Sequence, residues 1–360
     1  MEEHMKFPKL RVFLSKIEYN VRKLQELCGR KKIEIVGVTK GCSAIPEVAK
    51  ITVKGGIKTL GDSRIKNIKR LRKNKIAAEY MLLRIPMLSE LQEVIDYCDI
   101  SLNSEIETIL ALEEVAKKSN KIHKIIIMFD LGDLREGFLL KDIDRIARDL
   151  YNLQRIKIIG VGTNLGCYGG ILYTPEKMEK LIEIKKQLES RLKQEIPVIS
   201  GGSTASLGLI EKNEMPQEIN QLRIGEAILL GRDTTGNRKI PYLVQDTFIL
   251  QAEIIEKRHK GFVPQGTIGR DAFGNVPKFV DKGVRERSIL AIGKQDCQID
   301  NLEPLDEGVE ILGASSDHLI VDTEDSRKNY KLGEFIEFQM GYRAVLSLTT
   351  SKYVNIEIVN

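Results

Sequence analysis

The fold is decided by the stretch Ile33-Glu34-Ile35-Val36-Gly37-Val38-Thr39-Lys40-Gly41. It begins as an apolar run broken by one glutamate, which is typical of a strand buried on both faces, and it ends in a turn that carries a lysine. Before it, apolar residues from Ile17 to Cys28 recur on one face of a helix, which Gly29 closes. The stretch therefore predicts a helix followed by a buried strand whose end carries a polar turn.

The same alternation of a short β-rich run and a helix or turn recurs through the first two-thirds of the chain. Eight such runs are expected, which is the strand count of a (β/α)₈ barrel. Two long helical patterns cover Glu105–Ser119 and Pro175–Glu195. The expected strands are Ile33–Val38, Lys58–Leu60, Glu79–Ile85, Asp99–Asn103, Lys124–Asp130, Lys157–Thr163, Pro197–Ser200 and Gln221–Ile224.

Beyond about Gly236 the pattern changes to short alternating strands separated by Gly-rich turns, which favours an antiparallel β domain without a long helix. We therefore predict an α/β fold with two domains. Residues 1–235 form a (β/α)₈ TIM-type barrel, and residues 236–360 form a C-terminal antiparallel β domain. The strands expected in the second domain are Thr247–Ile255, Ser288–Ile292, Val309–Leu312, His318–Thr323 and Phe335–Met340.

Composition excludes several classes of protein. With 360 residues, 42% hydrophobic and 30% charged, the chain can bury a large core and is not expected to be disordered. The net charge of +5 and the lack of a basic block argue against nucleic acid, and no apolar run reaches the roughly 18 residues of a membrane span. The five cysteines and four histidines lack zinc-site spacing. We expect a cytoplasmic protein with no secretory signal, no bound metal and no disulfide framework.

Barrel enzymes keep their active sites at the C-terminal ends of the strands, so the residues that follow each strand are the candidates for chemistry. Lys40 follows the first strand and precedes a turn. A partly desolvated lysine in that position can lose its proton and form a Schiff base. The competing interpretation is an ordinary solvated loop lysine.

A second candidate is Gly201-Gly202-Ser203-Thr204, a glycine turn with two hydroxyls that opens a predicted helix after the seventh strand. Free N–H groups and the positive end of a helix dipole suit a phosphate, although Ser203 could equally be a simple N-cap. A lysine after the first strand and a phosphate site after the seventh are together what pyridoxal phosphate requires.

Eight short motifs, ordered along both predicted domains, carry a family resemblance: Val36-Gly37-Val38-Thr39-Lys40, Leu83-Arg84-Ile85-Pro86-Met87, Asp130-Leu131-Gly132-Asp133-Leu134-Arg135-Glu136-Gly137, Ser200-Gly201-Gly202-Ser203-Thr204, Leu222-Arg223-Ile224-Gly225-Glu226, Asp271-Ala272-Phe273-Gly274-Asn275, Gly313-Ala314-Ser315-Ser316-Asp317-His318 and Met340-Gly341-Tyr342. The chain resembles the alanine racemase family of fold-type III pyridoxal-phosphate enzymes, and within it the ornithine racemase branch. The resemblance implies a racemase that moves the Cα proton of ornithine, with lysine as the next candidate. It also implies a head-to-tail homodimer in which the partner's β domain closes each barrel mouth.

The resemblance assigns the cofactor contacts residue by residue. Lys40 matches the lysine that holds pyridoxal phosphate covalently. The phosphate cradle matches the hydroxyls of Ser203 and Thr204 with the backbone N–H groups of Gly225 and Glu226.

Four further residues complete the contacts that the resemblance implies. Arg223 matches the arginine that faces the pyridine nitrogen, and Arg135 matches an arginine near cofactor and substrate. Asn164 stands where alanine racemases have a histidine against the ring. Tyr342 matches a tyrosine that reaches the phosphate.

One departure from the family bears on the chemistry. The segment that carries a second acid/base tyrosine in alanine racemases here has Thr267, a hydroxyl that does not titrate near neutrality. The candidates for the second proton-transferring group are His318 and Asp271, with Tyr342 and Cys167 as more remote ones. We favour His318, because imidazole is suited to acid/base work near neutrality.

The substrate contacts are also expected in the β domain. The distal ammonium of ornithine needs a carboxylate, which we assign to Asp271, and Ser316 and Asp317 lie in the segment that contacts substrate in the family. The alternatives left open are a broad-specificity alanine-type racemase and a decarboxylase of basic amino acids, whose usual Cys-Asp motif is not found near the C-terminal end. Two non-catalytic functions are disfavoured. A cofactor-binding protein without catalysis would lack the β domain, and a scaffold protein with an inactive site would not need Lys40.

Overall fold

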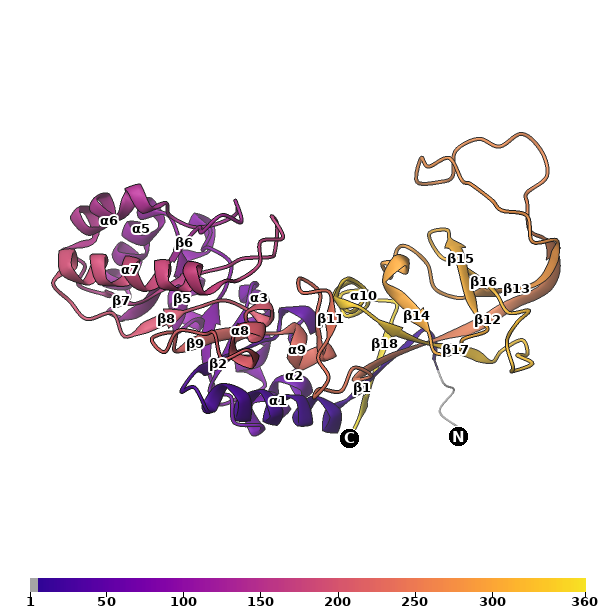
Figure 1. The fold of residues 1–360 in the computed structure, drawn as a ribbon, viewed down its shortest axis with the longest axis horizontal. Coiled ribbons are helices and arrows are strands. Elements are labelled where there is room, and N and C mark those ends of the chain that lie inside the picture. Colours follow the sequence, from indigo (N-terminus) through magenta and orange to yellow (C-terminus); the bar gives the residue numbers. More distant parts are fainter. Residues whose placement is uncertain (1–5) are drawn as a thin grey trace. The chain divides into compact units, whose positions relative to one another are not determined.

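The computed structural model describes residues 6–360, which fold into two compact units (Figure 1). One unit is Leu14–Gln245, and the other combines residues 6–13 with Asp246–Asn360. Residues 1–5, which fall within the range predicted for the barrel domain, lie outside the described part of the chain.

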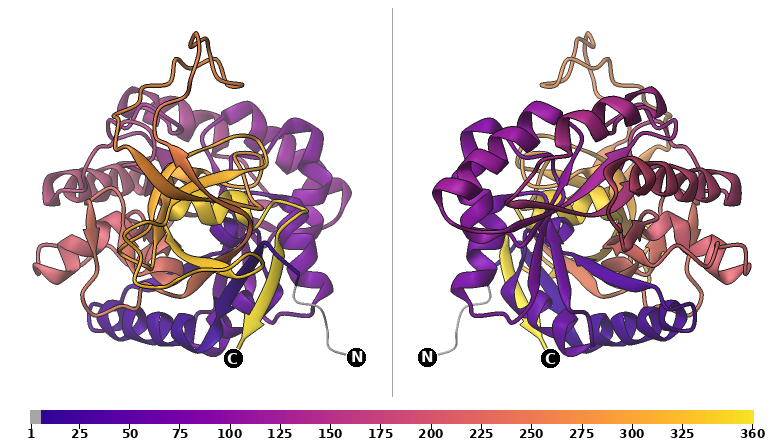
Figure 2. Two further views of the ribbon diagram at one scale, coloured as in Figure 1. Left: turned by 90° about the vertical axis from the view of Figure 1, so that its right-hand side faces the viewer. Right: turned by 90° about the vertical axis from the view of Figure 1, so that its left-hand side faces the viewer.

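The first unit is a closed barrel of eight parallel strands, which Figure 2 shows ringed by helices. The ring closes because β9 pairs with β2, with Glu34 opposite Gln221 and Gly37 opposite Ile224. The strands are β2 (Glu34–Val38), β3 (Thr59–Asp62), β4 (Glu79–Leu82), β5 (Ile100–Asn103), β6 (His123–Phe129), β7 (Ile156–Thr163), β8 (Val198–Ser200) and β9 (Gln221–Ile224).

The helices that cover the barrel are mostly short and amphipathic. In α1 the buried face carries Ile17, Val21, Leu24 and Cys28, the face that the sequence predicts. The helices are α1 (Leu14–Gly29), α2 (Pro46–Lys54), α3 (Ile65–Lys73), α4 (Leu91–Tyr97), α5 (Ile106–Lys118), α6 (Ile143–Leu150), α7 (Pro175–Leu192), α8 (Leu207–Glu211) and α9 (Glu226–Leu230), with 3₁₀ turns at Lys40–Cys42, Leu88–Glu90, Leu140–Asp142 and Thr204–Ser206. A two-residue ribbon of β10 (Arg232–Asp233) and β11 (Arg238–Lys239) follows α9.

The barrel interior is a packed apolar core, as is usual for this architecture. Side chains from four different strands, β2, β4, β5 and β6, meet there and are almost fully buried. They are Val36, Met81, Ile100, Leu102, Ile126 and Met128. This core holds the strands in register, so the residues that follow them are placed at one end, which we call the barrel mouth.

The second unit is built around one antiparallel sheet, in the order β14-β17-β12-β13-β16-β15, with a long irregular loop between β12 and β13 (Figure 1). The N-terminal strand β1 (Lys9–Phe13) joins this unit, pairing antiparallel with β12 and parallel with β18. The other elements are β12 (Phe248–Gly261), β13 (Val284–Leu290), a 3₁₀ turn at Ile299–Asn301, β14 (Leu302–Pro304), β15 (Glu310–Ala314), β16 (Leu319–Asp322), β17 (Phe335–Met340), α10 (Tyr342–Leu348) and β18 (Asn355–Val359).

The predicted fold class is confirmed, and each of the eight predicted barrel strands overlaps an observed one. The division of the chain differs from the predicted boundary after residue 235. The units separate between Gln245 and Asp246, because β10, β11 and the segment up to Val244 pack with the barrel helices: Asn20 of α1 donates to Val244 O over 2.9 Å. The N-terminal strand leaves the barrel unit because its hydrogen-bond partners lie more than 200 residues away along the chain.

Candidate active site

Lys40 lies at the barrel mouth, as the first residue of the turn after β2. Its ammonium forms no hydrogen bond or ion pair with any residue that the structure describes. Burial lowers the pKa of Lys40, and Arg135 lowers it further, whereas Cys167, Asp62 and Glu136 raise it. A lysine in this setting reaches the neutral, nucleophilic form more readily than a solvated one.

Behind Lys40, a buried carboxylate joins the ends of β2 and β3. Asp62 is 1% exposed, and its Oδ2 accepts a hydrogen bond from Thr39 Oγ1 over 2.8 Å. Its Oδ1 accepts from Arg64 N at 2.9 Å and Asn67 Nδ2 at 3.0 Å. Burial raises the pKa of Asp62, and these hydrogen bonds oppose the rise. Asp62 thus fixes the strand end that presents Lys40 and places a carboxyl group within electrostatic reach of it.

Arg223 projects from β9 and is 5% exposed. Nη1 donates to Ser200 O over 3.2 Å and to Ser200 Oγ, and Nη2 donates to Thr163 O. The guanidinium is therefore clamped by the ends of β7 and β8, whereas its Nε–H has no acceptor among the described residues. Burial lowers the pKa of Arg223, although a guanidinium stays charged at any physiological pH.

The glycine turn after β8 is packed against Tyr173. Gly202 has φ +128°, and a Cβ there would lie 2.3 Å from Tyr173 Cε1, so only glycine fits. The Tyr173 hydroxyl accepts from Leu165 N at 2.9 Å and donates to Leu165 O at 3.3 Å. This ring therefore ties the turn to the loop that follows β7.

Ser203 is not the simple N-cap that the competing interpretation describes, because its side chain makes no capping hydrogen bond. Thr204 Oγ1 instead accepts from Ala227 N over 3.2 Å and so joins the turn to the start of α9. The backbone N–H groups of Ser203, Thr204 and Glu226 find no acceptor within residues 6–360. Donors that converge from two loops without acceptors suit a phosphate group.

Glu226 uses its side chain elsewhere. Its carboxylate accepts from Thr234 N at 3.1 Å and from the Thr234 hydroxyl. Burial raises its pKa. Glu226 thus braces the start of α9 against the following ribbon, and its backbone N–H is the group free for a ligand.

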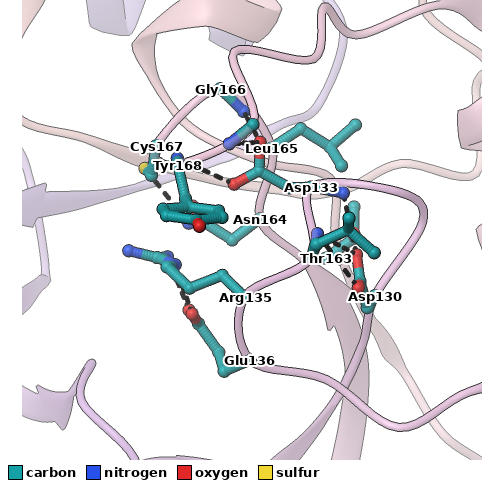
Figure 3. A network of polar contacts seen from close by, with 12 residues as sticks. Asp130, Asp133, Arg135, Glu136, Thr163, Asn164, Leu165, Gly166, Cys167 and Tyr168 are labelled. Atoms are coloured by element: carbon teal, nitrogen blue, oxygen red, sulfur yellow. Dashed lines mark hydrogen bonds and ion pairs between the residues drawn. The ribbon is translucent and has the colours of Figure 1, made fainter.

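Two loops of the barrel mouth are locked together by one carboxylate (Figure 3). Asp133, in the loop after β6, is fully buried and accepts backbone N–H groups from the loop after β7: Gly166 at 2.9 Å, Tyr168 at 3.0 Å and Gly169 at 3.1 Å. Asp130 organises its own loop in the same way, since its Oδ1 accepts from Gly132 N and Asp133 N. The network holds the shape of the rim between β6 and β7.

Arg135 and Asn164 are presented by these two loops (Figure 3). Arg135 forms a two-pronged ion pair with Glu136, with Nη2 at 2.6 Å from Oε1. The Asn164 Nδ2 group donates to Cys167 Sγ over 3.2 Å. Cys167 is exposed, whereas Cys28, Cys42, Cys98 and Cys297 are buried.

In the β unit, Asp271 shapes its own turn. Its carboxylate accepts from Phe273 N at 2.9 Å and Asn275 N at 2.8 Å, and these hydrogen bonds, with that from Asn275 first, hold its pKa below the usual value. Lys294 Nζ lies 4.0 Å from Asp271 Oδ2. The group is therefore an ionised carboxylate that already has one cation beside it.

The other β-unit candidates lie on exposed turns. His318 is exposed at the tip between β15 and β16, where its Nδ1 is 3.5 Å from Ser315 Oγ. The Ser316 hydroxyl donates to Asp317 Oδ2 over 2.6 Å. Tyr342 begins α10. The structure thus gathers the barrel candidates at one mouth and places Asp271, Ser316, Asp317, His318 and Tyr342 in the other unit.

Sequence reasoning missed three residues that organise the mouth. Asp62 and Asp133 were missed because their partners are backbone N–H groups and a threonine on neighbouring loops, which no local pattern indicates. Tyr173 was missed because the glycine turn it contacts lies about thirty residues away. An aspartate at the end of a barrel strand was the available signal for Asp62.

Among residues 6–360 no cluster of three or more His, Cys, Asp or Glu side chains could hold a metal, and no helix is long and apolar enough to cross a membrane.

Comparison with known proteins decides the family. The profile described as alanine racemase, N-terminal domain, matches residues 12–233. The chain belongs to the alanine racemase family. The match to this family covers the barrel unit up to the end of β10 and leaves out only residues 234–245, so it includes every candidate residue of the barrel mouth.

Two curated members of the family are similar to this chain over nearly its full length. The ornithine racemase of Acetoanaerobium sticklandii is 43% identical over 354 residues, which cover 98% of this chain and 100% of that protein. The lysine racemase of Thermotoga maritima is 45% identical over 351 residues, covering 97% and 98%. The crystal structure of alanine racemase from Bartonella henselae with covalently bound pyridoxal phosphate has a TM-score of 0.73 at 17% identity, covering 98% and 99%, which shows the shared fold.

Proposed function

We propose that this protein is a pyridoxal-phosphate-dependent racemase of basic amino acids, with ornithine as the first substrate and lysine as the second. The observation that carries the proposal is Lys40, a desolvated lysine with no partner in the described chain, in the same barrel mouth as unpaired N–H donors. The names and near-complete coverage of the ornithine and lysine racemases support the substrate class.

The residues of the mouth fit the cofactor. Lys40 would hold it covalently, since its amine is unpaired and its pKa is lowered. Ser203, Thr204 and the N–H groups of Gly225 and Glu226 would hold the phosphate. Arg223 would face the pyridine nitrogen, because Nε is the one guanidinium nitrogen that no described residue engages.

Pyridoxal phosphate, when bound, delocalises the electron pair that is left at Cα when the proton departs. Arg223 cannot give up its proton, so it offers a hydrogen bond without protonating the nitrogen, which keeps the electron sink moderate and favours return of the proton. Lys40, at Nζ, takes or returns the Cα proton on one face of the substrate. Arg135, oriented by Glu136, offers a cation to the substrate carboxylate.

Within the β unit we assign recognition of the distal ammonium to Asp271, and we assign further substrate contacts to Ser316 and Asp317, which lie in the segment that contacts substrate in the family. The lowered pKa of Asp271 keeps it ionised, as an ammonium partner must be. The ammonium of ornithine would compete with Lys294 for this carboxylate. The family resemblance further supports a homodimer in which both protomers contribute to each active site. It also supports a location in the cytoplasm. Mixing an inactive Lys40 variant with an inactive Asp271 variant is expected to restore activity if the sites are shared.

A spectrum with a substrate panel tests the proposal. The purified protein with added pyridoxal phosphate is expected to show a visible band that borohydride removes, and to racemise L-ornithine and then L-lysine. Lys40→Ala is expected to lose both the band and the activity, whereas the exposed Lys50→Ala retains both. Preference for alanine would contradict the substrate class, release of carbon dioxide would indicate the decarboxylase, and a reducible band in Lys40→Ala would overturn the assignment of the lysine.

A further inference from the structure

Racemisation of an α-amino acid requires proton transfer on both faces of Cα. If the protein is the racemase proposed above, Lys40 serves one face, and a second group must serve the other. Such a group has to be accessible, to exchange a proton near neutrality and to reach Cα from a different direction than Lys40.

Cys167 enters the mouth from the far side of the barrel. Lys40 follows β2, and Cys167 lies in the loop after β7. Along the shorter path around the closed ring, β8 and β9 lie between these two strands. In an eight-stranded ring, strands three steps apart lie almost across the axis from one another. The two groups nevertheless lie within electrostatic range of each other, since burial lowers the pKa of Lys40 and Cys167 opposes that shift.

The sulfur of Cys167 is held in place by a neighbouring side chain. Asn164 Nδ2 donates to Cys167 Sγ over 3.2 Å, which orients the side chain and offers a donor to a thiolate. The backbone on both sides of Cys167 is fixed, because Asp133 accepts from Gly166 N and Tyr168 N (Figure 3). The loop therefore presents one exposed thiol in a defined position.

We propose that Cys167 is the acid/base that acts on the face of Cα opposite Lys40. In one direction the Cα–H bond breaks and its proton passes to Lys40 Nζ, while the Cys167 S–H bond breaks and its proton forms the new Cα–H bond. This leaves an ammonium and a thiolate. The reverse direction begins from that pair, with the thiolate taking the proton, so no other reactant is consumed.

The other titratable groups of the mouth are less suited to this step. The Tyr173 hydroxyl is buried, has a raised pKa and is occupied by Leu165. The Asp62 carboxylate already accepts hydrogen bonds from three donors. Glu136 is paired with Arg135. Of Tyr173, Asp62, Glu136 and Cys167, the thiol is the exposed group without a partner that accepts its proton.

Enantiomer-resolved exchange tests the proposal. Holoenzyme carrying Cys167→Ala is expected to bind the cofactor and to lose racemisation by about 10²- to 10⁴-fold. In D₂O it is expected to exchange the Cα hydrogen of only one of the two ornithine enantiomers. Cys167→Ser keeps a hydroxyl for Asn164 but does not titrate near neutrality, so it is expected to be as inactive as alanine. Cys98→Ala removes a buried thiol of the same unit and is expected to retain activity.

Chemical labelling gives an independent readout. Iodoacetamide is expected to modify Cys167 alone in the native protein, with loss of racemisation in proportion to the mass shift and with protection by ornithine. The proposal is overturned if labelled enzyme stays active, if Cys167→Ser restores activity, or if His318→Gln rather than Cys167→Ala restricts exchange to one enantiomer. A wild-type protein that racemises no amino acid would instead contradict the proposed function.

Discussion

Asp62, the last residue of β3, and Thr39, which directly follows the neighbouring strand β2, are joined by a hydrogen bond of 2.8 Å from Thr39 Oγ1 to Asp62 Oδ2. This bond lies one residue before Lys40 along the chain. It ties the backbone from which Lys40 projects to a carboxyl group that is shielded from solvent. The pair thus affects both the position of Lys40, through the hydrogen bond, and the pKa of Lys40, through the carboxylate charge. Mutation can separate these two effects.

Asp62→Asn is expected to lower the pKa of Lys40 further, because the Asp62 charge favours the ammonium form and its loss removes that support. Uptake of pyridoxal phosphate by cofactor-free protein requires the neutral amine, so its rate rises with pH. In Asp62→Asn the midpoint of this pH profile is expected to move to lower pH by less than about one unit. Thr39→Val removes the hydrogen bond but retains the charge, so its midpoint should stay in place. A shift toward higher pH in Asp62→Asn would refute the electrostatic role.

Asp133→Asn is expected to loosen the rim between β6 and β7. An amide keeps one acceptor oxygen but points an N–H₂ group at a backbone donor, so at least one of the three hydrogen bonds to the 166–169 loop is lost. The expected cost is about 2–3 kcal/mol of stability, since hydrogen bonds to a buried charge are the strong ones.

Hydrogen exchange checks this expectation, because the amides of Gly166, Tyr168 and Gly169 should lose protection in Asp133→Asn while those of the barrel strands do not. Asp144→Asn, on exposed α6, serves as control and should change stability by less than about 0.5 kcal/mol. Unchanged protection of the three amides would show that the carboxylate does not hold the loop.

The barrel could be predicted from sequence because each of its strands is a local signal. Runs such as Lys124–Asp130 are buried on both faces, so they remain apolar throughout, and the observed β6 begins and ends one residue earlier. The position of Lys40 followed from the same signal, since the end of β2 could be located to the residue.

What could not be predicted depends on contacts between distant segments. β1 joins the second unit through pairing with β12 and β18, and no residue within Lys9–Phe13 indicates that choice. Asp133 was quoted only as part of a motif, although its carboxylate organises two loops. The family resemblance named Asn164, but only the folded loop shows that its amide points at Cys167.

Gly202→Ala is expected to destabilise the protein and to weaken cofactor binding. The new Cβ would lie 2.3 Å from Tyr173 Cε1 at a φ of +128°, so both the ring and the backbone must shift. Strain and overpacking together are expected to cost about 2–4 kcal/mol. Gly208→Ala, in α8 a few residues later with no atom near its Cβ position, is expected to be neutral or to stabilise by about 0.5–1 kcal/mol. Thermal unfolding with and without pyridoxal phosphate measures both, and equal behaviour of the two variants would contradict the close contact.

His123 predicts how stability depends on pH. It is 2% exposed at the start of β6, with its Nε2 at 2.8 Å from Ser101 Oγ. Burial lowers its pKa from 6.5 to about 4. The unfolded chain therefore binds a proton between pH 6.5 and 4 that the folded protein does not, so the free energy of unfolding falls as the pH drops through this window.

From these two pKa values, the contribution of His123 amounts to a loss of about 2 kcal/mol between pH 7.5 and pH 5. His123→Gln can still meet the Ser101 hydroxyl but does not titrate, so its urea-denaturation free energy should fall less over this interval by about that amount. His259→Gln, which removes an exposed imidazole of the β unit, serves as the matched control. If His123→Gln loses as much stability as the wild type on acidification, His123 is protonated in the folded barrel and the burial argument is wrong.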